Sequence, residues 1–214
     1  MSLDRWRCHT QRFGFRQHFS IAPWSDFMET HWGNGCQFYV TPVAPGKVCC
    51  VLMSRDPHLR IAGALPLFPE LARRLAATAG SSSERGAATG KRLLHRVTRG
   101  NIALVGDAAG CADPITGQGL RLAFLQAEAL AAALERGDLD YYEQAHRSMM
   151  RQPSIMGDLM HTLDRWPRLR QRAIPALAAR PDLFGNLLAL HVGEGSLSRM
   201  AATATALCWG VIAQ

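Results

Sequence analysis

The sequence lacks the features that mark exported and membrane-spanning proteins. Its first residues, MSLDRWRCHTQR, carry charges but no apolar core and no small-residue cleavage site, so we expect no secretory signal. No apolar stretch reaches the roughly 20 residues that a membrane span requires. The nearest, residues 200–213, fits a buried helix or an interfacial one. These absences predict a cytoplasmic protein, and nothing in the sequence supports membrane association.

The sequence also lacks the spacings that metal sites, disulfide frameworks and hydrolases need. No cysteine pair has the C-x-x-C spacing, so we expect reduced, buried thiols and no zinc site. His9, His18 and His31 fall on separate predicted strands without a carboxylate at ligand spacing, which argues against a metal. No G-x-S-x-G elbow is present, so hydrolysis has no support. The six cysteines are Cys8, Cys36, Cys49, Cys50, Cys111 and Cys208.

Acidic residues are fewer than basic ones, and the formal net charge is +7. Arginines gather in residues 161–182, where two interpretations stand. They form either a solvated basic helix face, which is the commoner case, or a surface for lipid or another anionic partner. Aromatic residues at stacking spacing are absent, so we expect no nucleic-acid partner. The clustered arginines are Arg165, Arg168, Arg170, Arg172 and Arg180.

The first ninety residues show the alternation of apolar and polar residues that is typical of antiparallel strands. The sequence GNG at residues 33–35 predicts a hairpin, because Asn and Gly tolerate the positive φ that tight turns demand. Pro-Gly at residues 45–46 predicts a second turn, residues 66–79 a helix and residues 81–90 a polar loop. Strands are predicted over residues 12–21, 27–32, 37–43 and 47–53.

The rest of the chain is predicted to be mainly helical. Residues 101–106 form a short apolar run without alternation, which suits a parallel strand buried on both faces. Residues 117–136 predict a helix that ends at Gly137, and Asp138 can cap the next helix. One apolar face of the first helix comprises Leu120, Phe124, Ala127, Ala131 and Leu134. Breaks between the later helices are expected near Pro153, Pro167, Pro175 and Pro181.

Residues 104–120, LVGDAAGCADPITGQGL, place small residues around one acid at the start of a helix. Asp107 would follow the apolar strand, at the edge where open α/β sheets bind ligands, and its carboxylate can accept hydrogen bonds from sugar-like hydroxyls. The following AAG would let a ligand approach the backbone. Gly117 and Gly119 bracket the first helical turn, whose free N–H groups suit an electron-rich group. An ordinary strand–helix turn with a capping Asp would show the same pattern.

The pattern G-D-A-A-G-x-x-x-P-x-x-G-Q-G-L, followed by an Ala- and Leu-rich helix, closely resembles the second FAD-binding motif of the flavin monooxygenase superfamily. This superfamily includes p-hydroxybenzoate-hydroxylase-like and geranylgeranyl-reductase-like enzymes. The resemblance implies that Asp107 binds the ribityl hydroxyls of FAD and that Pro114 lies beside the isoalloxazine ring. It also implies that backbone N–H groups of residues 117–119 face the pyrimidine edge, where reduced flavin is negative. The implied cofactor-binding residues are Gly106, Asp107, Ala108, Gly110, Pro114, Gly117, Gln118 and Gly119.

Weaker resemblances extend over most of the chain, while no catalytic residue can be assigned. RFGFRQHF and QFYVTPV are similar to strands of the superfamily's substrate sheet, and Thr41-Pro42 resembles a strand end that faces the flavin. The aromatic residues of the predicted sheet belong either to its core, which is the favoured interpretation, or to an apolar substrate cavity. They are Phe15, Phe19, Trp24, Trp32 and Tyr39.

Two other motifs of the superfamily are missing. We find no N-terminal G-x-G-x-x-G for the FAD pyrophosphate and adenosine, and no Asp-Gly pair of the kind thought to serve both FAD and NAD(P)H. We therefore expect the C-terminal portion of a longer enzyme, present as a truncated product or as one half of a split protein. Its partner would be the missing N-terminal FAD-binding segment. The isolated chain is expected to bind FAD weakly or not at all.

The predicted fold class is α+β, with a partial FAD-binding α/β fold. Its segments are a substrate-type antiparallel sheet with a helix (1–90), a partial FAD-binding unit (91–137) and a C-terminal helical region (138–214). The predicted parent is an FAD-dependent oxidoreductase that uses NAD(P)H, either as a monooxygenase of a small apolar substrate or as an isoprenoid-type reductase. The alternative is a non-catalytic remnant that acts as a basic binding module for lipid or another anionic partner.

Overall fold

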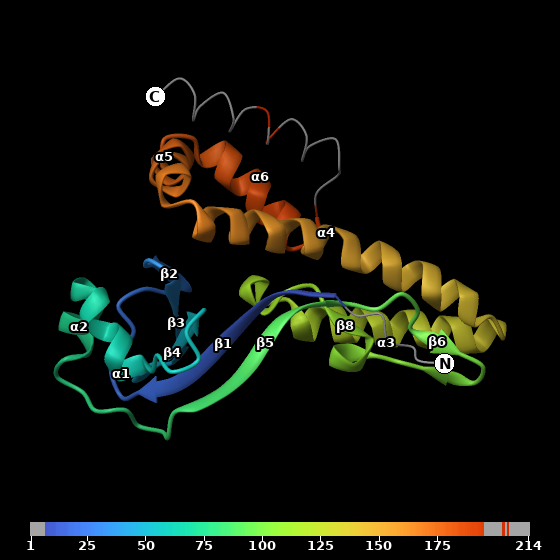
Figure 1. Cartoon of the computed structure of the whole chain (residues 1–214), viewed down its shortest axis with the longest axis horizontal. Coiled ribbons are helices and arrows are strands. Elements are labelled where there is room, and N and C mark those ends of the chain that lie inside the picture. Colours follow the sequence, from blue (N-terminus) through green and yellow to red (C-terminus); the bar gives the residue numbers. More distant parts are fainter. Residues whose placement is uncertain (1–6, 195–202, 204, 206–214) are drawn as a thin grey trace. The chain divides into compact units, whose positions relative to one another are not determined.

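The computed structural model describes residues 7–194, 203 and 205, with side chains from residue 11 onward (Figure 1). The chain divides into two compact units, one of Thr10–Thr89 and one of Gly90–Gln214 together with Met1–His9. This division reflects compactness alone, so the three functional segments given above stay a prediction. The helix predicted for residues 200–213 lies outside the described residues, apart from residues 203 and 205.

The Thr10–Thr89 unit is built on an antiparallel sheet, which confirms the predicted fold class. The hairpin between β2 and β3 turns at residues 33–35, where Gly35 takes a φ of 76°. Asn34 does not share that angle, because no non-glycine among the described residues has a positive φ. The sheet order is β2-β3-β4-β1-β5, with β1 (Arg7–Phe19), β2 (Glu29–Trp32), β3 (Cys36–Ala44), β4 (Lys47–Ser54) and β5 (Arg85–Leu93).

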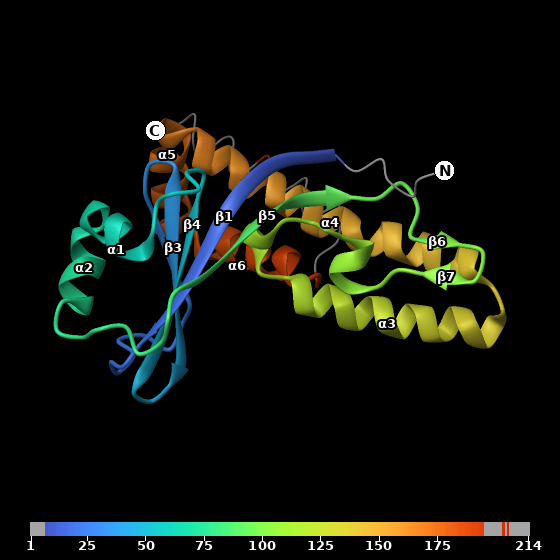
Figure 2. The ribbon, with the colours of Figure 1, turned by 60° about the horizontal axis from the view of Figure 1, so that its bottom comes forward.

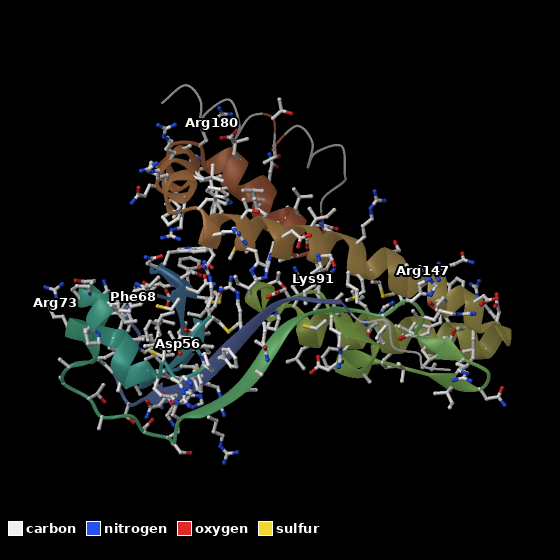
Figure 3. All side chains as sticks on the ribbon, in the orientation of Figure 1. Asp56, Phe68, Arg73, Lys91, Arg147 and Arg180 are labelled. Atoms are coloured by element: carbon white, nitrogen blue, oxygen red, sulfur yellow. The ribbon has the colours of Figure 1, made fainter. Side chains whose placement is uncertain are left out.

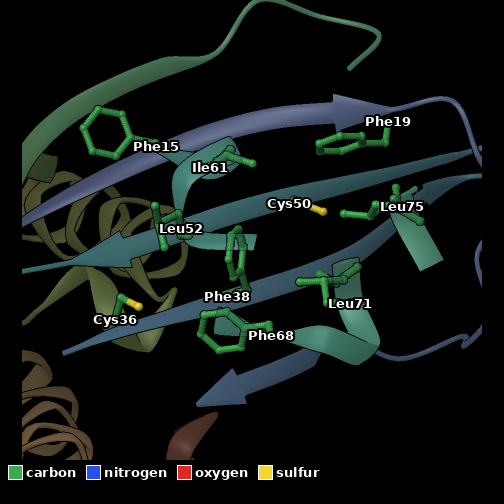
Figure 4. Close-up of a cluster of buried hydrophobic side chains, with 13 residues drawn as sticks. Phe15, Phe19, Cys36, Phe38, Cys50, Leu52, Ile61, Phe68, Leu71 and Leu75 are labelled. Atoms are coloured by element: carbon green, nitrogen blue, oxygen red, sulfur yellow. The ribbon is translucent and has the colours of Figure 1, made fainter. Parts of the chain in front are cut away.

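One face of this sheet packs on two short helices, α1 (Ile61–Ala64) and α2 (Pro69–Leu75), to form an apolar core (Figure 4). Strand alternation supplies the core, because Phe38 and every second residue around it point to the helices. Phe38 meets Phe68 edge to face, with ring centroids 5.1 Å apart. The core comprises Phe15, Phe19, Cys36, Phe38, Val40, Val48, Cys50, Leu52, Ile61, Ala64, Phe68, Leu71 and Leu75.

The aromatic residues singled out in the sequence divide between the two faces of the sheet. Phe15 and Phe19 belong to the core, and Trp24 packs against it. Tyr39 follows Phe38 and therefore points to the opposite face. Trp32 pairs with Gln37, which also alternates with Phe38, so it shares that opposite face. Tyr39 is nevertheless buried, at 9% exposure, so the core interpretation holds for Phe15, Phe19, Trp24 and Tyr39, whereas Trp32 is half-buried.

Two expectations for this unit are wrong. Residues 66–79 do not form one helix, because a 3₁₀ turn, η1 (Leu65–Leu67), is separated from α2 by Phe68 with φ −129°. The following Pro69 disfavours a helical conformation at Phe68. Residues 81–90 are not wholly a loop, because β5 begins at Arg85. Gly86 makes this possible, since a Cβ there would lie 2.3 Å from the Phe15 ring.

The second unit is mainly helical within the described residues (Figure 2). Its long helices, α3 and α4, pack side by side. A short hairpin packs against α4, and the glycine-rich loop contacts both helices. The helices are α3 (Gly119–Arg136), α4 (Leu139–Arg165), α5 (Pro167–Ala178) and α6 (Pro181–His191). The hairpin is β6 (Thr98–Arg99) with β7 (Ile102–Ala103), and the loop contains η2 (Gly106–Ala109), β8 (Gly110–Cys111) and η3 (Pro114–Thr116).

The prediction of a buried parallel strand over residues 101–106 is wrong. Only Ile102–Ala103 is a strand, and it pairs antiparallel with Thr98–Arg99. Gly100 has a φ of 55°, which lets the chain reverse direction at once. The strand therefore forms its backbone hydrogen bonds with the strand directly before it. Ile102 remains 61% exposed, so this run is not buried on both faces. Asp107 consequently lies in a 3₁₀ turn and not at the end of a parallel strand.

The prolines break fewer helices than the sequence predicts. Pro153 lies inside α4 and Pro175 inside α5, so the breaks expected there are wrong. Pro167 and Pro181 do mark breaks, because each occupies the first position of a helix, where the missing N–H has no intrahelical partner to lose. Among the residues that the structure describes, no helix combines the length and apolar character needed to cross a bilayer.

Helix α3 ends where predicted, begins two residues later than predicted, at Gly119, and buries a different face. Gly137 ends it with a φ of 64°, as predicted. The predicted apolar face points outward: Leu120, Phe124 and Leu134 are 78%, 69% and 64% exposed. The buried side of the helix carries Leu122, Gln126 and Ala133 instead. Helix α3 is therefore apolar on two sides, and the described residues cover only one of them.

Candidate functional site

The candidate site is the loop of residues 106–119, whose backbone depends on three glycines. Gly106, Gly110 and Gly117 have φ values of 62°, 120° and 66°, a region that other residues rarely adopt. At Gly110 a Cβ would also lie 2.6 Å from the Arg92 carbonyl oxygen. The strand pairing of β8 with β5 therefore requires glycine at this position. These constraints explain why the sequence places its most permissive residues here.

Part of the loop faces outward and part is packed against the unit. Asp107 and Ala108 are exposed, whereas Ala109 is fully buried. Gly117 and Gly119 are exposed at the start of the 18-residue helix α3. The first N–H groups of a helix lack intrahelical acceptors and carry a partial positive charge. The loop thus presents one carboxylate and one helix start to an incoming molecule.

The first half of the loop is held from behind by side chains of α3 and α4. Gln126, 1% exposed, accepts a hydrogen bond from the Gly106 N–H at 2.7 Å. The Tyr142 hydroxyl donates to the Leu104 carbonyl at 2.6 Å. Burial and, less strongly, the Glu143 charge raise the pKa of Tyr142 to about 12, so the phenol stays a donor. These contacts fix the entry to the loop on both sides of Val105.

The hairpin before the loop is held by one buried carboxylate. Glu143 accepts hydrogen bonds from the Val97 N–H, the Thr98 N–H and the Thr98 hydroxyl, at 3.0, 3.1 and 2.9 Å. Burial acts to raise the pKa of Glu143, but these hydrogen bonds outweigh it and the net shift is downward. Burial lowers the pKa of the neighbouring His146, which hydrogen-bonds the Ala109 backbone. A charged Glu143 beside a neutral His146 therefore supports this half of the loop.

The second half of the loop is organised around Asp113, which is 2% exposed. Its Oδ1 accepts from the Ile115 N–H at 3.0 Å, and its Oδ2 lies 2.6 Å from His161 Nε2. Its backbone carbonyl accepts from the Thr116 hydroxyl at 2.8 Å. Asp113 thus caps the η3 turn that carries Pro114 and leads into Gly117.

The start of α3 is tied to the end of α6. The Gln118 side chain, 6% exposed, donates to the His191 carbonyl, while its Oε1 accepts from Arg121 at 3.4 Å. Burial lowers the pKa of His191, and the Arg121 charge acts in the same direction. The Gln118 side chain is therefore occupied within the protein, which leaves its backbone as the part that could meet a ligand.

The thiol in the loop has no features of a nucleophile. Burial, followed by the charges of Asp113 and Asp107, raises the pKa of Cys111 to about 11. Burial likewise raises the pKa of Cys50 to about 12, so both groups are thiols at neutral pH. Cys36, Cys49, Cys50 and Cys111 form no disulfide bond.

The structure brings the sequence-predicted site residues together on one continuous loop. Gly106, Asp107, Ala108, Gly110, Pro114, Gly117, Gln118 and Gly119 all lie within it. Their assignment to a cofactor stays a prediction, since no ligand is present. The His18 and His31 side chains belong to the other unit, and the described residues contain no cluster of three metal-ligating side chains.

The comparisons with known proteins point to flavin enzymes. No protein-family model matches the chain. The solved structure of the flavin-dependent brominase Bmp2 is similar over 98% of this chain and 58% of its own, at 18% identity and a TM-score of 0.74. The p-nitrophenol 4-monooxygenase PnpA from Pseudomonas putida DLL-E4 is similar over 88% of this chain and 55% of its own, at 18% identity and a TM-score of 0.65. A curated flavin-dependent monooxygenase from an unknown prokaryote is 52% identical over 46 residues, 22% of this chain and 12% of that protein.

The chain has the fold of the flavin monooxygenase superfamily. The resemblance drawn from residues 106–120 is confirmed at that level. The chain spans just over half the length of the two solved relatives, and its match covers 12% of the curated one. Bmp2 and the curated monooxygenase are both flavin-dependent by name.

The sequence did not identify the side chains of α3 and α4 that hydrogen-bond the loop and its hairpin in this flavin monooxygenase fold. Gln126 lies on α3, and Glu143 and His161 lie on α4, so all three follow the motif in the chain. Each is a polar residue on the buried side of its helix. A polar residue within an otherwise apolar helix face could have identified them in the sequence, because a buried polar group needs a hydrogen-bonding partner.

Proposed function

We propose that this chain forms the flavin-ring part of an FAD-dependent oxidoreductase. The observation that carries the proposal is the loop of residues 106–119. It exposes the Asp107 carboxylate and the N-terminal amides of α3 on a backbone that only glycine can adopt at three positions. A carboxylate and a helix start are the groups that suit a hydroxylated chain and an electron-rich ring edge, respectively. The residues present therefore fit a flavin.

FAD would supply the redox chemistry, and the chain's own residues would bind and orient it. Asp107 would accept hydrogen bonds from the ribityl hydroxyls, and Pro114 would lie against the ring. The amides at the start of α3 would stabilise negative charge at the pyrimidine edge. The Gly117 N–H is not one of them, because it donates to the Pro114 carbonyl at 3.0 Å. No protein acid or base is required for these roles. The parent enzyme would use NAD(P)H as reductant, either as a monooxygenase that takes O₂ and an apolar substrate or as a reductase of an isoprenoid-like double bond.

Titration of the purified chain with riboflavin, FAD and ADP tests this proposal. Riboflavin and FAD should bind with similar micromolar affinity, and ADP should not bind, because the loop serves the ring and ribityl parts alone. Asp107→Ala should weaken riboflavin binding about tenfold, the equivalent of one charge-assisted hydrogen bond. Asp140→Ala, at an equally exposed acid, should leave it unchanged. No riboflavin binding at about 1 mM would refute the flavin site. Sub-micromolar FAD binding would show that the chain needs no further segment.

The partner in this proposal is a dinucleotide-binding segment that covers the outer face of α3. We define this α3 outer face as Leu120, Phe124, Ala127, Ala131 and Leu134. A helix that is apolar on two sides is normally buried on both. The flavin relatives are longer than this chain, and the sequence contains no G-x-G-x-x-G. Their additional length supports a second segment as the occupant of this face.

Coding sequence upstream of Met1, or in an adjacent gene, should therefore encode G-x-G-x-x-G. Its product, expressed together with this chain, should slow hydrogen exchange of α3 and strengthen FAD binding at least 100-fold. Phe124→Lys should abolish both effects, whereas Phe27→Lys, at a comparably exposed phenylalanine of the other unit, should not. Absence of such a segment, or binding unaffected by Phe124→Lys, would refute the docking proposal.

The alternative function, a basic binding module for lipid or another anionic partner, has less support. Arg170 is buried and donates to the Leu163 carbonyl, and Arg180, which is labelled in Figure 3, pairs with Asp182 at 2.9 Å. Arg165, Arg168 and Arg172 stay exposed. Binding to vesicles of anionic lipid that disappears as salt is raised would favour this function.

A further inference from the structure

The last turn before α3 is clamped by one face of α4. Asp113 is fully enclosed at its side chain, and both of its carboxylate oxygens have partners. One partner, the Ile115 N–H, belongs to the same turn. The other, His161, comes from 48 positions further along the chain. This carboxylate therefore joins the turn that carries Pro114 to a separate helix.

Gly157 allows α4 to come close enough for this contact. A Cβ at Gly157 would lie 3.1 Å from the Asp113 Cβ and 3.5 Å from the Ala112 carbonyl oxygen. Gly157 and His161 are four residues apart, so they lie one above the other on the same face of the helix. The first removes the side chain that would push the turn away, and the second adds a hydrogen bond to the turn.

The pairing also explains why a buried carboxylate is tolerated here. An enclosed carboxylate costs free energy unless its oxygens receive hydrogen bonds, and bonds to a charged acceptor are stronger and shorter than neutral ones. The 2.6 Å contact of His161 Nε2 with Asp113 Oδ2 meets this need on one oxygen.

We propose that His161 is a positioning residue for the flavin site. Through Asp113 it fixes the η3 turn, and the turn sets the place of Pro114 and of the start of α3 relative to the flavin ring. Gly157 contributes to the same positioning, because it lets α4 approach the turn closely. The proposal rests on the proposed flavin function for its ligand, but the fixing of the turn can be measured without any ligand.

The full-length chain is compared as wild type, His161→Leu and His161→Gln, with His31→Leu as a matched control. His31 makes an equivalent contact with Glu29, 3.1 Å, in the other unit. Leucine fills the space of His161 without donating, whereas the glutamine amide can reach the carboxylate. Hydrogen exchange is followed for residues 112–119 and for the core strands β3 and β4, and riboflavin binding is titrated in parallel.

His161→Leu should speed exchange of residues 112–119 at least tenfold without changing β3 and β4, and should weaken riboflavin binding about tenfold. His161→Gln should stay within threefold of wild type, and His31→Leu should have no effect on either. A purely structural role would instead lower protection across the whole unit. Equal behaviour of His161→Leu and wild type in both measurements would overturn the proposal.

Gly157→Ala keeps the test decisive if His161→Leu does not fold. It retains both hydrogen-bonding partners and favours the helix, because alanine is the better helix former. We expect faster exchange in residues 112–119 and a several-fold loss of riboflavin binding in a chain that is otherwise as well folded as wild type. Unchanged values would overturn the proposal. If wild type binds no riboflavin while the exchange results hold, the flavin function fails and the positioning of the turn stands.

Discussion

The two units of the chain are stabilised in different ways. The Thr10–Thr89 unit has a single continuous apolar core, in which sheet and helices meet through Phe38 and its neighbours. The Gly90–Gln214 unit has smaller apolar clusters and relies on buried polar residues, among them Gln126, Glu143 and Asp113. Apolar burial is non-directional, whereas hydrogen bonds fix geometry. The comparison shows that the unit with the candidate site uses directed contacts where a loop must keep one conformation.

The largest effect should come from emptying the core of the sheet unit. Phe38→Ala should lower the free energy of unfolding of this unit by about 4 kcal/mol, the usual scale for a buried phenylalanine. Hydrogen exchange of β3 and β4 measures it. Phe27→Ala, at a residue 78% exposed, serves as the control and should change stability by less than about 0.5 kcal/mol. Equal effects of the two substitutions would contradict the core described here.

A buried carboxylate should matter nearly as much in the other unit. Glu143→Leu leaves the Val97 and Thr98 donors unpaired and should cost about 3 kcal/mol, since each orphaned buried donor is expensive. The loss should appear as faster exchange of residues 97–106, with β3 and β4 unchanged. Glu70→Leu removes an exposed carboxylate that pairs with Arg74, and should change little. A global loss of protection, or none, would argue against a local clamp.

Acid should weaken the Gly90–Gln214 unit before the sheet unit. The pKa values of His146 and His191 are lowered from 6.5, so the folded unit binds fewer protons than the unfolded chain. Their contribution is complete above pH 6.5 and is lost as the pH falls below it. The pKa of Glu143 is lowered from 4.5, which adds a second decline below that pH. Exchange-detected stability at pH 7.5, 6.5 and 5.5 measures the first decline, and His146→Gln should flatten it.

The smallest effect is expected on the α3 outer face. Phe124→Ser should change the free energy of unfolding by less than about 0.5 kcal/mol, because the side chain is 69% exposed. Urea unfolding of the chain alone is the measurement. A loss of more than about 1 kcal/mol would mean that this face is already covered, and the docking proposal would fail with it.

The sequence was most informative where one local rule decides the structure. Period-two alternation located β3 and β4, and Gly137 with Asp138 marked the junction of α3 and α4, where Asp138 accepts from the Asp140 N–H at 2.9 Å. The motif of residues 106–119 identified the loop itself. Local rules failed where a distant neighbour decides, as at Gly86, whose strand conformation depends on the Phe15 ring.

The buried faces were the hardest feature to derive. The apolar pattern of α3 fits two opposite sides, and burial of Gln126 follows only once Gly106 is known to need an acceptor. The parallel strand expected near Ile102 assumed neighbours that the described chain does not contain. His161 could not be connected to Asp113, because their contact depends on the approach of α4 that Gly157 permits.

The side chains of α3 and α4 that hold the loop and its hairpin lie after the loop in the chain. They are Gln126, Tyr142, Glu143 and His161, and the His191 backbone carbonyl, which accepts from Gln118, belongs to the same compact unit. The loop and the residues that hold it are therefore contiguous in the sequence and can be inherited together. A recombination event near residue 90 would transfer the motif, its clamps and its helix start as one inheritable piece. Related proteins could then exchange their antiparallel sheets without rebuilding the loop.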